Sequence, residues 1–257
     1  MCLLEYRGYG HSDGSPSEEG MYMDAQAGLD HLSQRSDIDP NKVLVFGRSL
    51  GGAVAIEIAS RCENREKISG LIVENTFTSI PDIARTLFSF RMVRMIPTWF
   101  YKNQFKSRWK VCRICVPVLF LSGTADQLIP SKMMTDLYSA CGAEFKSLAR
   151  FPNGTHNETW TCPHYYHAML YFMEEVILMR YYIIGGADLK YVYIFSQGCQ
   201  SHIACQRRPN STASGSSQRN DTHLKFRRQM CDVFRLSCGI VIFIFRSQKC
   251  GTFGVGY

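Results

Sequence analysis

The sequence predicts an α/β fold, in which a mostly parallel sheet is flanked by helices. Short apolar, β-branched runs alternate along the chain with segments of helical character, and this alternation is typical of βαβ units. The most informative junction is the run 43–46, which continues into Gly47-Arg48-Ser49-Leu50-Gly51-Gly52 and then into the apolar stretch 53–59. The run predicts a buried strand and the stretch predicts a helix, so Ser49 is expected on the turn between them.

The other elements follow in order along residues 1–179. Further strands are expected at 1–6, 68–73, 116–121 and 145–151, which are short apolar runs. Further helices are expected at 17–34, 131–141 and 165–179. Two glutamates stand in the first turn of the helix at 17–34, where they favour the positive end of the helix dipole.

The segment 180–257 differs from the rest of the chain in charge and in pattern. Residues 1–177 carry 18 Lys and Arg against 19 Asp and Glu, whereas residues 178–257 carry 11 against 3. Helical periodicity ends, 210–220 is rich in Ser, Arg and Asn, and 240–245 is a β-prone apolar run. We expect a basic, unstructured tail. The positive charge belongs to this tail, so it does not indicate that the main domain binds nucleic acid or acidic lipid, and no nucleic-acid partner is predicted.

Cysteines and apolar runs limit the classes of protein that the chain can belong to. The eleven cysteines have irregular spacings, which indicate reduced thiols rather than a disulfide framework. Cys112 and Cys115 have no second pair at a zinc-like spacing, so no metal site is predicted. No stretch reaches the ~18–20 apolar residues that span a bilayer, and no secretory signal is visible.

A serine on a strand-to-helix turn predicts nucleophilic catalysis, provided that a base and an acid lie nearby. In enzymes whose nucleophilic serine lies on a strand-to-helix turn, the acid and then the base come later in the sequence than the serine. Asp126 follows the strand 116–121, and His156 lies in the loop after 145–151. Glu74 and Asp82 are alternative acids. The Leu50 backbone N–H is expected to donate to an oxyanion, and small residues are needed at Gly47 and Gly51.

Residues 3–177 resemble the α/β-hydrolases, specifically the group of α/β-hydrolase domain-containing protein 13, which is related to yeast Bem46-type proteins. The resembling stretches are LLEYRGYGHSDGSPSEEG, VLVFGRSLGGAVAIEIAS, VENTFTSIPDIARTLFSF, LFLSGTADQLIP and FPNGTHNETW. The resemblance implies that Ser49 is the nucleophile, Asp126 the acid and His156 the base, with no cofactor. It also implies a membrane-anchored family of serine hydrolases, with protein-acyl thioesterase activity inferred for the wider group.

The resemblance begins inside the family's catalytic domain, so an incomplete α/β-hydrolase fold is expected at 1–179. The membrane helix, the first three strands and the loop with the second oxyanion donor are missing from the match. Residues 1–6 resemble the family's fourth strand and 43–46 its fifth, and the third strand normally lies between them. Backbone groups of both are expected to lack partners. Without the family's single-pass anchor, this chain is expected to be soluble and cytoplasmic, or peripheral to the membrane.

The expected activity is hydrolysis of an acyl ester or thioester through an acyl-enzyme, with a palmitoyl thioester on a protein as one substrate. A serine peptidase is the alternative enzyme, and a non-catalytic truncated product or interaction module is the alternative outside enzymes. The segment 79–110 is expected to form a small helical cap. Its apolar residues either line an acyl pocket or form the inner face of two cap helices. These residues are Phe88, Phe90, Met92, Met95, Ile96, Trp99 and Phe100.

Overall fold

Four consecutive parallel strands form the larger part of the sheet. The structure is a computed structural model that describes residues 1–39, 42–87, 96–184 and 240–244. The strands are β2 (Val43–Arg48), β3 (Gly70–Glu74), β4 (Val118–Gly123) and β5 (Lys146–Phe151). Each strand pairs in parallel with the next one along the chain. The predicted mostly parallel sheet is confirmed.

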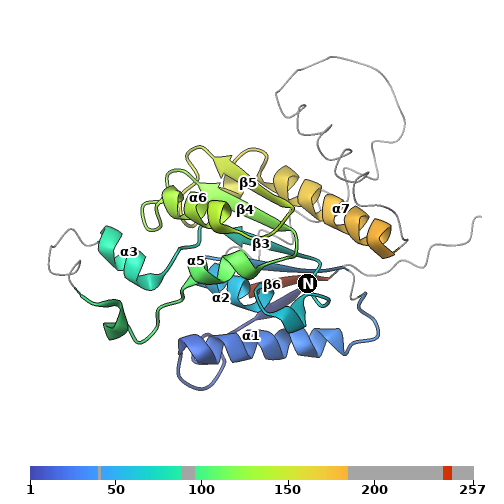
Figure 1. The fold of residues 1–257 in the computed structure, drawn as a ribbon, viewed down its shortest axis with the longest axis horizontal. Coiled ribbons are helices and arrows are strands. Elements are labelled where there is room, and N and C mark those ends of the chain that lie inside the picture. The colour runs from blue at the N-terminus through green and yellow to red at the C-terminus, as the bar shows by residue number, and fades with distance from the viewer. Residues whose placement is uncertain (40–41, 88–95, 185–239, 245–257) are drawn as a thin grey trace, which may run out of the picture.

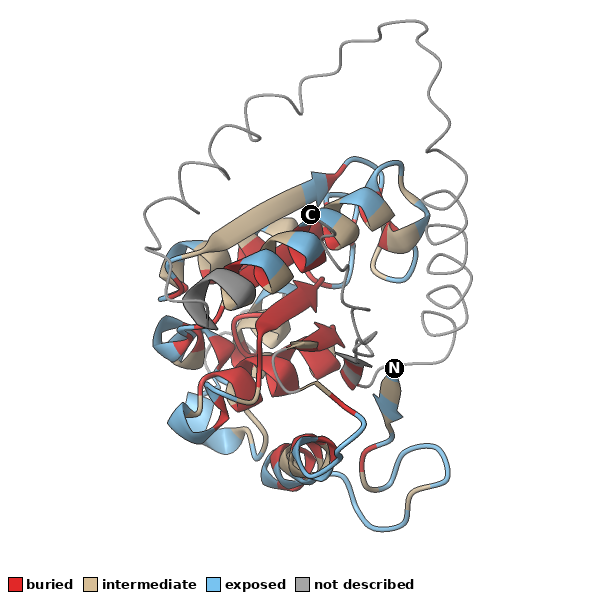
Figure 2. Ribbon diagram, turned by 90° about the vertical axis from the view of Figure 1, so that its right-hand side faces the viewer, coloured by how far each residue is buried: buried red, intermediate tan, exposed pale blue. Residues whose placement is uncertain are grey.

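Helices cover both faces of this sheet (Figure 1). One face is covered by α1 (Glu18–Ser33), α2 (Leu50–Ala59) and α6 (Ser131–Ala140), and the other by α7 (Tyr165–Ile184). Successive residues of a strand point to opposite faces, so Val45 joins the cluster with α1 and α2, whereas Phe46 joins the cluster with α7. Figure 2 shows that buried residues fill the central strands and the helix surfaces that face them.

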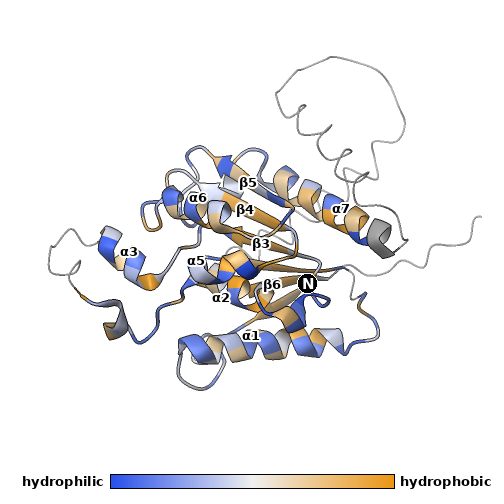
Figure 3. Cartoon of the chain, in the orientation of Figure 1, coloured by the Kyte–Doolittle hydropathy of each residue, from blue (hydrophilic) through white to orange (hydrophobic). Residues whose placement is uncertain are grey.

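Helix α1 illustrates how the sequence pattern produces this packing. The Ser17 side chain accepts a hydrogen bond from the Gly20 N–H, which caps the first turn. Met21, Ala25, Leu29 and Leu32 are buried and recur at helical spacing. Figure 3 shows the mixture of hydrophobic and hydrophilic residues along this helix. The apolar face therefore packs toward the sheet and the polar face meets solvent.

The rest of the sheet contains a strand from the segment 180–257, which was expected to be an unstructured tail. The strand β6 (Ile240–Ile244) lies between β1 (Cys2–Leu4) and β2, and it is antiparallel to both. Ile242 lies opposite Cys2 on one side and Val45 on the other. The helix α7 also extends into the expected tail, as far as Ile184.

The physical reason is the composition of the run 240–244. Its β-branched and aromatic residues favour a strand, and its backbone supplies hydrogen-bonding partners to the facing edges of β1 and β2. Ile240 and Ile242 are buried in the same cluster as α1 and α2. The sequence predicted a gap between β1 and β2, where the family's third strand normally lies. In the structure β6 occupies this position. The rest of the expected tail, 185–239 and 245–257, lies outside the described residues.

The segment expected to form a cap contains short helices. They are α3 (Ile80–Leu87), η3 (Thr98–Phe100) and α5 (Ser107–Lys110). The Glu18 carboxylate fixes the return of this segment, because it accepts the N–H groups of Gln104 and Phe105 at 2.6 and 2.9 Å. Three further short helices are η2 (Cys62–Asn64), η4 (Val111–Arg113) and η5 (Thr159–Thr161). No helix among the described residues has the length and apolar character needed to cross a bilayer.

Candidate active site

Ser49 lies on a sharp turn between β2 and α2, as the sequence predicts. Its φ of 53° and ψ of −119° lie in a region that L-residues rarely adopt. The turn is held from the neighbouring strand: the Ser49 N–H donates to the Glu74 carbonyl oxygen at 2.9 Å, and the Thr76 hydroxyl donates to the Ser49 carbonyl oxygen at 2.7 Å. These bonds fix the strained backbone from both sides.

Two glycines allow strand and helix to approach closely at this turn. A Cβ on Gly47 would lie 2.3 Å from the Gly51 carbonyl oxygen, and a Cβ on Gly52 would lie 2.6 Å from the Thr76 Cβ. Side chains at 47 and 52 are thus excluded sterically. Gly51 contributes the backbone that Gly47 approaches, and the requirement for glycine at 52 was not predicted from the sequence.

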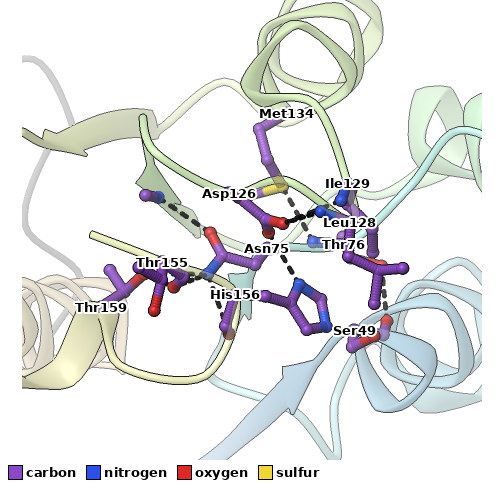
Figure 4. Close-up of polar contacts among 11 residues, drawn as sticks. Ser49, Asn75, Thr76, Asp126, Leu128, Ile129, Met134, Thr155, His156 and Thr159 are labelled. Atoms are coloured by element: carbon purple, nitrogen blue, oxygen red, sulfur yellow. Dashed lines mark hydrogen bonds and ion pairs between the residues drawn. The ribbon is translucent and has the colours of Figure 1, made fainter. Parts of the chain in front are cut away.

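The structure brings Ser49, His156 and Asp126 together (Figure 4). His156 Nε2 lies 3.0 Å from Ser49 Oγ, and His156 Nδ1 lies 2.7 Å from Asp126 Oδ2. The Asp126 side chain is 1% exposed and that of His156 is 14% exposed. The other Asp126 oxygen accepts the backbone N–H groups of Leu128 and Ile129, each at 2.8 Å. Asp126 is therefore fixed in orientation by the loop that follows β4.

This arrangement is suited to moving a proton from the Ser49 hydroxyl. A carboxylate can only accept hydrogen bonds, so Asp126 favours the tautomer of His156 that carries its proton on Nδ1. In that tautomer Nε2 is an acceptor that faces the hydroxyl. The Leu50 N–H, at the start of α2, has no acceptor among the described residues, so it is free to donate to a developing oxyanion.

The alternative acids have other partners in the structure. Asp82 accepts from the Thr78 hydroxyl at 2.7 Å and pairs with Arg85. Glu74 is fully buried, and its Oε2 accepts from the Tyr165 hydroxyl at 2.7 Å, while its Oε1 has no hydrogen-bond partner among the described residues. Burial raises the pKa of Glu74 to about 7, opposed by the Tyr165 hydrogen bond and the Arg48 charge.

Asn75 is a site residue that the sequence analysis did not single out. It is fully buried and has a φ of 43°. Its side-chain oxygen accepts from the Gly123 N–H at 2.8 Å, and its side-chain nitrogen donates to the Thr159 hydroxyl and to the carbonyl oxygens of Thr155 and His156. Asn75 thus connects the end of β4 to the loop that carries His156. A polar residue directly after a predicted strand was the available signal.

The residues expected to line an acyl pocket are only partly described. Phe88 and Met92 lie outside the described residues. The Trp99 ring is 74% exposed and contacts Phe100, with their ring centroids 4.5 Å apart. Trp99 therefore lies on the surface. A cavity of about 980 Å³ lies elsewhere, between β5 and α7, and Ser49, Asp126 and His156 do not line it.

Comparisons with known proteins agree with the fold. The family described as Serine aminopeptidase, S33 (Hydrolase_4) matches residues 1–111. Over 194 residues the chain is 41% identical to Alpha/beta hydrolase domain-containing protein WAV2 of Arabidopsis thaliana, covering 68% of this chain and 60% of that protein. Over 177 residues it is 39% identical to Protein bem46 of Schizosaccharomyces pombe, covering 68% and 58%.

A solved structure also shares the fold. The solved structure of DcsB in complex with its substrate analogue superposes on this chain with a TM-score of 0.50 at 16% identity, covering 66% of this chain and 79% of that chain. The chain belongs to the α/β-hydrolases by fold and sequence. Within that class its relatives are of the WAV2 and bem46 type, as the resemblance predicted, and it spans about three fifths of their length.

Proposed function

We propose that this hydrolase cleaves acyl esters or thioesters, with Ser49 as nucleophile, His156 as base and Asp126 as the orienting acid. The observation that carries the proposal is the continuous hydrogen-bonded path from Asp126 through His156 to the Ser49 hydroxyl. The three residues follow three different strand ends, β2, β4 and β5. Catalytic triads are recognised by geometry and role rather than by sequence spacing, and this arrangement supports the proposed roles.

The residue types determine the steps. His156 Nε2 takes the Ser49 proton as Oγ bonds to the acyl carbon, and the carbonyl oxygen becomes an oxyanion that accepts from the Leu50 N–H. The bond to the alcohol or thiol then breaks, the leaving group takes the proton from His156, and an acyl-enzyme remains. Water attacks the acyl carbon with His156 again as base, which releases the acid and restores Ser49. No metal or organic cofactor takes part in these steps.

The finer substrate proposal is a fatty-acyl thioester on a protein, such as a palmitoyl group. The thiolate of a thioester is a good leaving group. Hydrolysis therefore depends on an activated nucleophile more than on protonation of the leaving group. The competing enzyme function is a serine peptidase, favoured by the aminopeptidase description of the family that matches residues 1–111. Turnover of an S-palmitoyl peptide in preference to an aminoacyl anilide supports the thioesterase, and the reverse preference supports the peptidase.

Labelling with a fluorophosphonate tests whether Ser49 is a nucleophile. We expect the full chain to be labelled, and we expect Ser49→Ala and His156→Ala to lose the label. Ser139→Ala and His11→Ala are matched controls, because both residues are exposed and their hydrogen bonds are to Thr135 and Glu5 rather than to Ser49, His156 or Asp126, and both should be labelled like the wild type. Absence of label on folded wild-type protein would overturn the proposal and favour the non-catalytic alternative.

A further inference from the structure

The cavity between β5 and α7 lies along an open edge of the sheet. β5 is the last strand in the order β1-β6-β2-β3-β4-β5, and β4 is the strand that pairs with it. Figure 1 shows β5 at the top of the sheet with α7 beside it. The cavity, of about 980 Å³, is lined by the consecutive residues 147–153 and by residues of α7. The edge of β5 and the cavity therefore form one surface feature, the β5–α7 groove.

The backbone of β5 presents groups without a strand partner along this groove. The carbonyl oxygens of Phe145 and Phe151 accept from N–H groups at the two ends of β4, each at 3.0 Å. Successive residues of a strand direct their backbone groups to opposite edges, so those of Lys146, Leu148 and Arg150 point away from β4. No strand among the described residues pairs with that side. A row of open N–H and C=O groups is a template for a further strand.

The two faces of β5 differ in chemistry. Ala149 packs with apolar residues of α7 and lines the cavity. On the other face two cations extend toward α6: the Lys146 ammonium lies 5.4 Å from the centre of the Tyr138 ring, and the Arg150 guanidinium donates to the Thr135 hydroxyl at 3.2 Å. Neither cation forms an ion pair with a described residue. A strand added at this edge therefore places alternate side chains over an apolar cavity and beside two cations.

Charge disfavours the two occupants that this chain could itself supply. If two copies paired antiparallel through β5 about Leu148, Lys146 of each copy would lie opposite Arg150 of the other, and like charges directly opposite are destabilising. The segment 185–239 carries 8 Lys and Arg against 3 Asp and Glu, so it does not complement these cations either. The charge of the groove thus favours acidic groups supplied by another molecule.

We propose that the β5–α7 groove binds an extended segment of another protein in which acidic residues alternate with apolar ones. The segment adds to the sheet as a further strand. Its backbone pairs with the open groups of β5, its apolar side chains enter the cavity, and its carboxylates lie beside Lys146 and Arg150. In strand addition the main-chain hydrogen bonds supply affinity and the alternate side chains supply specificity. The inference is independent of the proposed function, because it involves no reacting group.

Fluorescence anisotropy of labelled peptides tests the side-chain pattern. The full chain should bind a short fluorescein-labelled peptide in which Glu alternates with Val. A peptide of the same composition with all its Glu residues before its Val residues, and an alternating peptide of Lys and Val, should each bind about tenfold more weakly, because cross-strand charge pairs are lost. Absence of binding, or equal binding of the three peptides, would overturn the proposal.

Charge reversal in β5 tests where the peptide binds. Lys146→Glu with Arg150→Glu should reverse the preference, so that the Lys–Val peptide binds more tightly than the Glu–Val peptide. A misfolded variant would lose both peptides and could not produce this gain. Lys102→Glu with Lys106→Glu is the matched control, since both residues are exposed and lie between α3 and α5, and it should keep the wild-type preference. The same change in both double variants, or no reversal in folded protein, would contradict the proposal.

Methylation of the peptide backbone tests the strand pairing. The amides of alternate residues face opposite edges of an added strand, so N-methyl groups on the Glu residues and N-methyl groups on the Val residues block different edges. One of the two methylated peptides should bind like the parent and the other should lose binding. Equal affinity of the two would rule out strand addition. A concentration-dependent dimer of the full chain that excludes the Glu–Val peptide would also refute the proposal, because it would assign the edge to a second copy.

Discussion

The parts of the sheet on the two sides of β2 differ in how far apart in the sequence their paired strands lie. On one side β2, β3, β4 and β5 are consecutive strands, and each pairs with its neighbour in sequence. On the other side β1 and β2 are held together by β6, whose residues come from 240–244. Ser49, Asp126 and His156 all follow strands of the first side. The candidate site is therefore built on βαβ units that are local in sequence. The other edge of β2, in contrast, is paired by β6, a segment far away in sequence.

The substitution Asp126→Asn, on the β2–β5 side of the sheet, should lower activity strongly while changing stability little. The amide oxygen can still accept from the Leu128 and Ile129 N–H groups, so the loop should remain folded. The amide favours the wrong tautomer of His156, and turnover should fall about 10⁴-fold, roughly 5 kcal/mol. Ester or thioester hydrolysis and urea unfolding measure the two effects. Asp136→Asn on α6 is the control, and a loss below tenfold in Asp126→Asn would argue against the proposed role.

The substitution Ile242→Ala tests whether the second side is part of the cooperative fold. Ile242 is 2% exposed, and truncation of a buried isoleucine costs about 2–5 kcal/mol of unfolding free energy. Ile72→Ala in β3 is the matched substitution on the first side, since Ile72 is also fully buried. Similar decreases in the urea midpoint mean that both sides unfold as one unit. An unchanged midpoint for Ile242→Ala would show that β6 does not hold β1 and β2 together in solution.

The substitution Glu74→Gln should change how stability depends on pH. The pKa of Glu74 is raised from 4.5 to about 7 in the folded state, so the folded protein binds this proton more tightly than the unfolded chain. The corresponding stability is present below about pH 4.5 and is lost as pH rises through 7, up to about 3 kcal/mol. Glutamine never ionises, so the variant should be more stable than wild type at pH 8 and similar at pH 5.

Urea unfolding at several pH values measures this difference. Glu63→Gln is the control, because Glu63 is exposed and its replacement should leave the pH profile unchanged. A Glu74→Gln profile parallel to that of the wild type would contradict the assignment of this proton to Glu74.

The smallest expected effect concerns Asn75. Asn75→Ala leaves the Gly123 N–H and the Thr155 and His156 carbonyl oxygens without this partner, which should cost about 1–3 kcal/mol of unfolding free energy. Turnover should also fall, because the loop carrying His156 loses an anchor. Asn75→Gly removes the same bonds but tolerates the positive φ, so the difference between the variants isolates backbone strain. Full activity in both would show that Asn75 does not position His156.

Local patterns were sufficient to predict the first side of the sheet. The run 43–46 and the Gly47-to-Gly52 turn define a strand and a helix within a few residues, and the Asp126 and His156 loops follow recognisable strands. Parallel strands joined by helices place their carboxyl ends at one edge, so their order along the chain already implies proximity. The geometry agrees with that prediction in bringing the three side chains within hydrogen-bond distance.

The second side could not be predicted because its pairing is not local. The run 240–245 was identified as β-prone, but nothing in its own residues specifies a partner far away in sequence. The role of Asn75 was also hidden, because it depends on Gly123 and Thr159 reaching the same point in space. Trp99 was expected either to line an acyl pocket or to lie on the inner face of a cap helix, because it is apolar, and apolar character does not distinguish these positions from an exposed surface.

The position of β6 has a consequence for the order in which the protein is made. A ribosome synthesises β1 and every element through α7 before it reaches residue 240, so the first side can fold while the β2 edge is still unpaired. Closing that edge then requires a contact between distant segments, which is a slow class of folding event. During this interval an open strand edge and an apolar strand from different nascent chains can pair with each other. Yield of the folded protein should therefore fall as the rate of synthesis and the local concentration of chains rise.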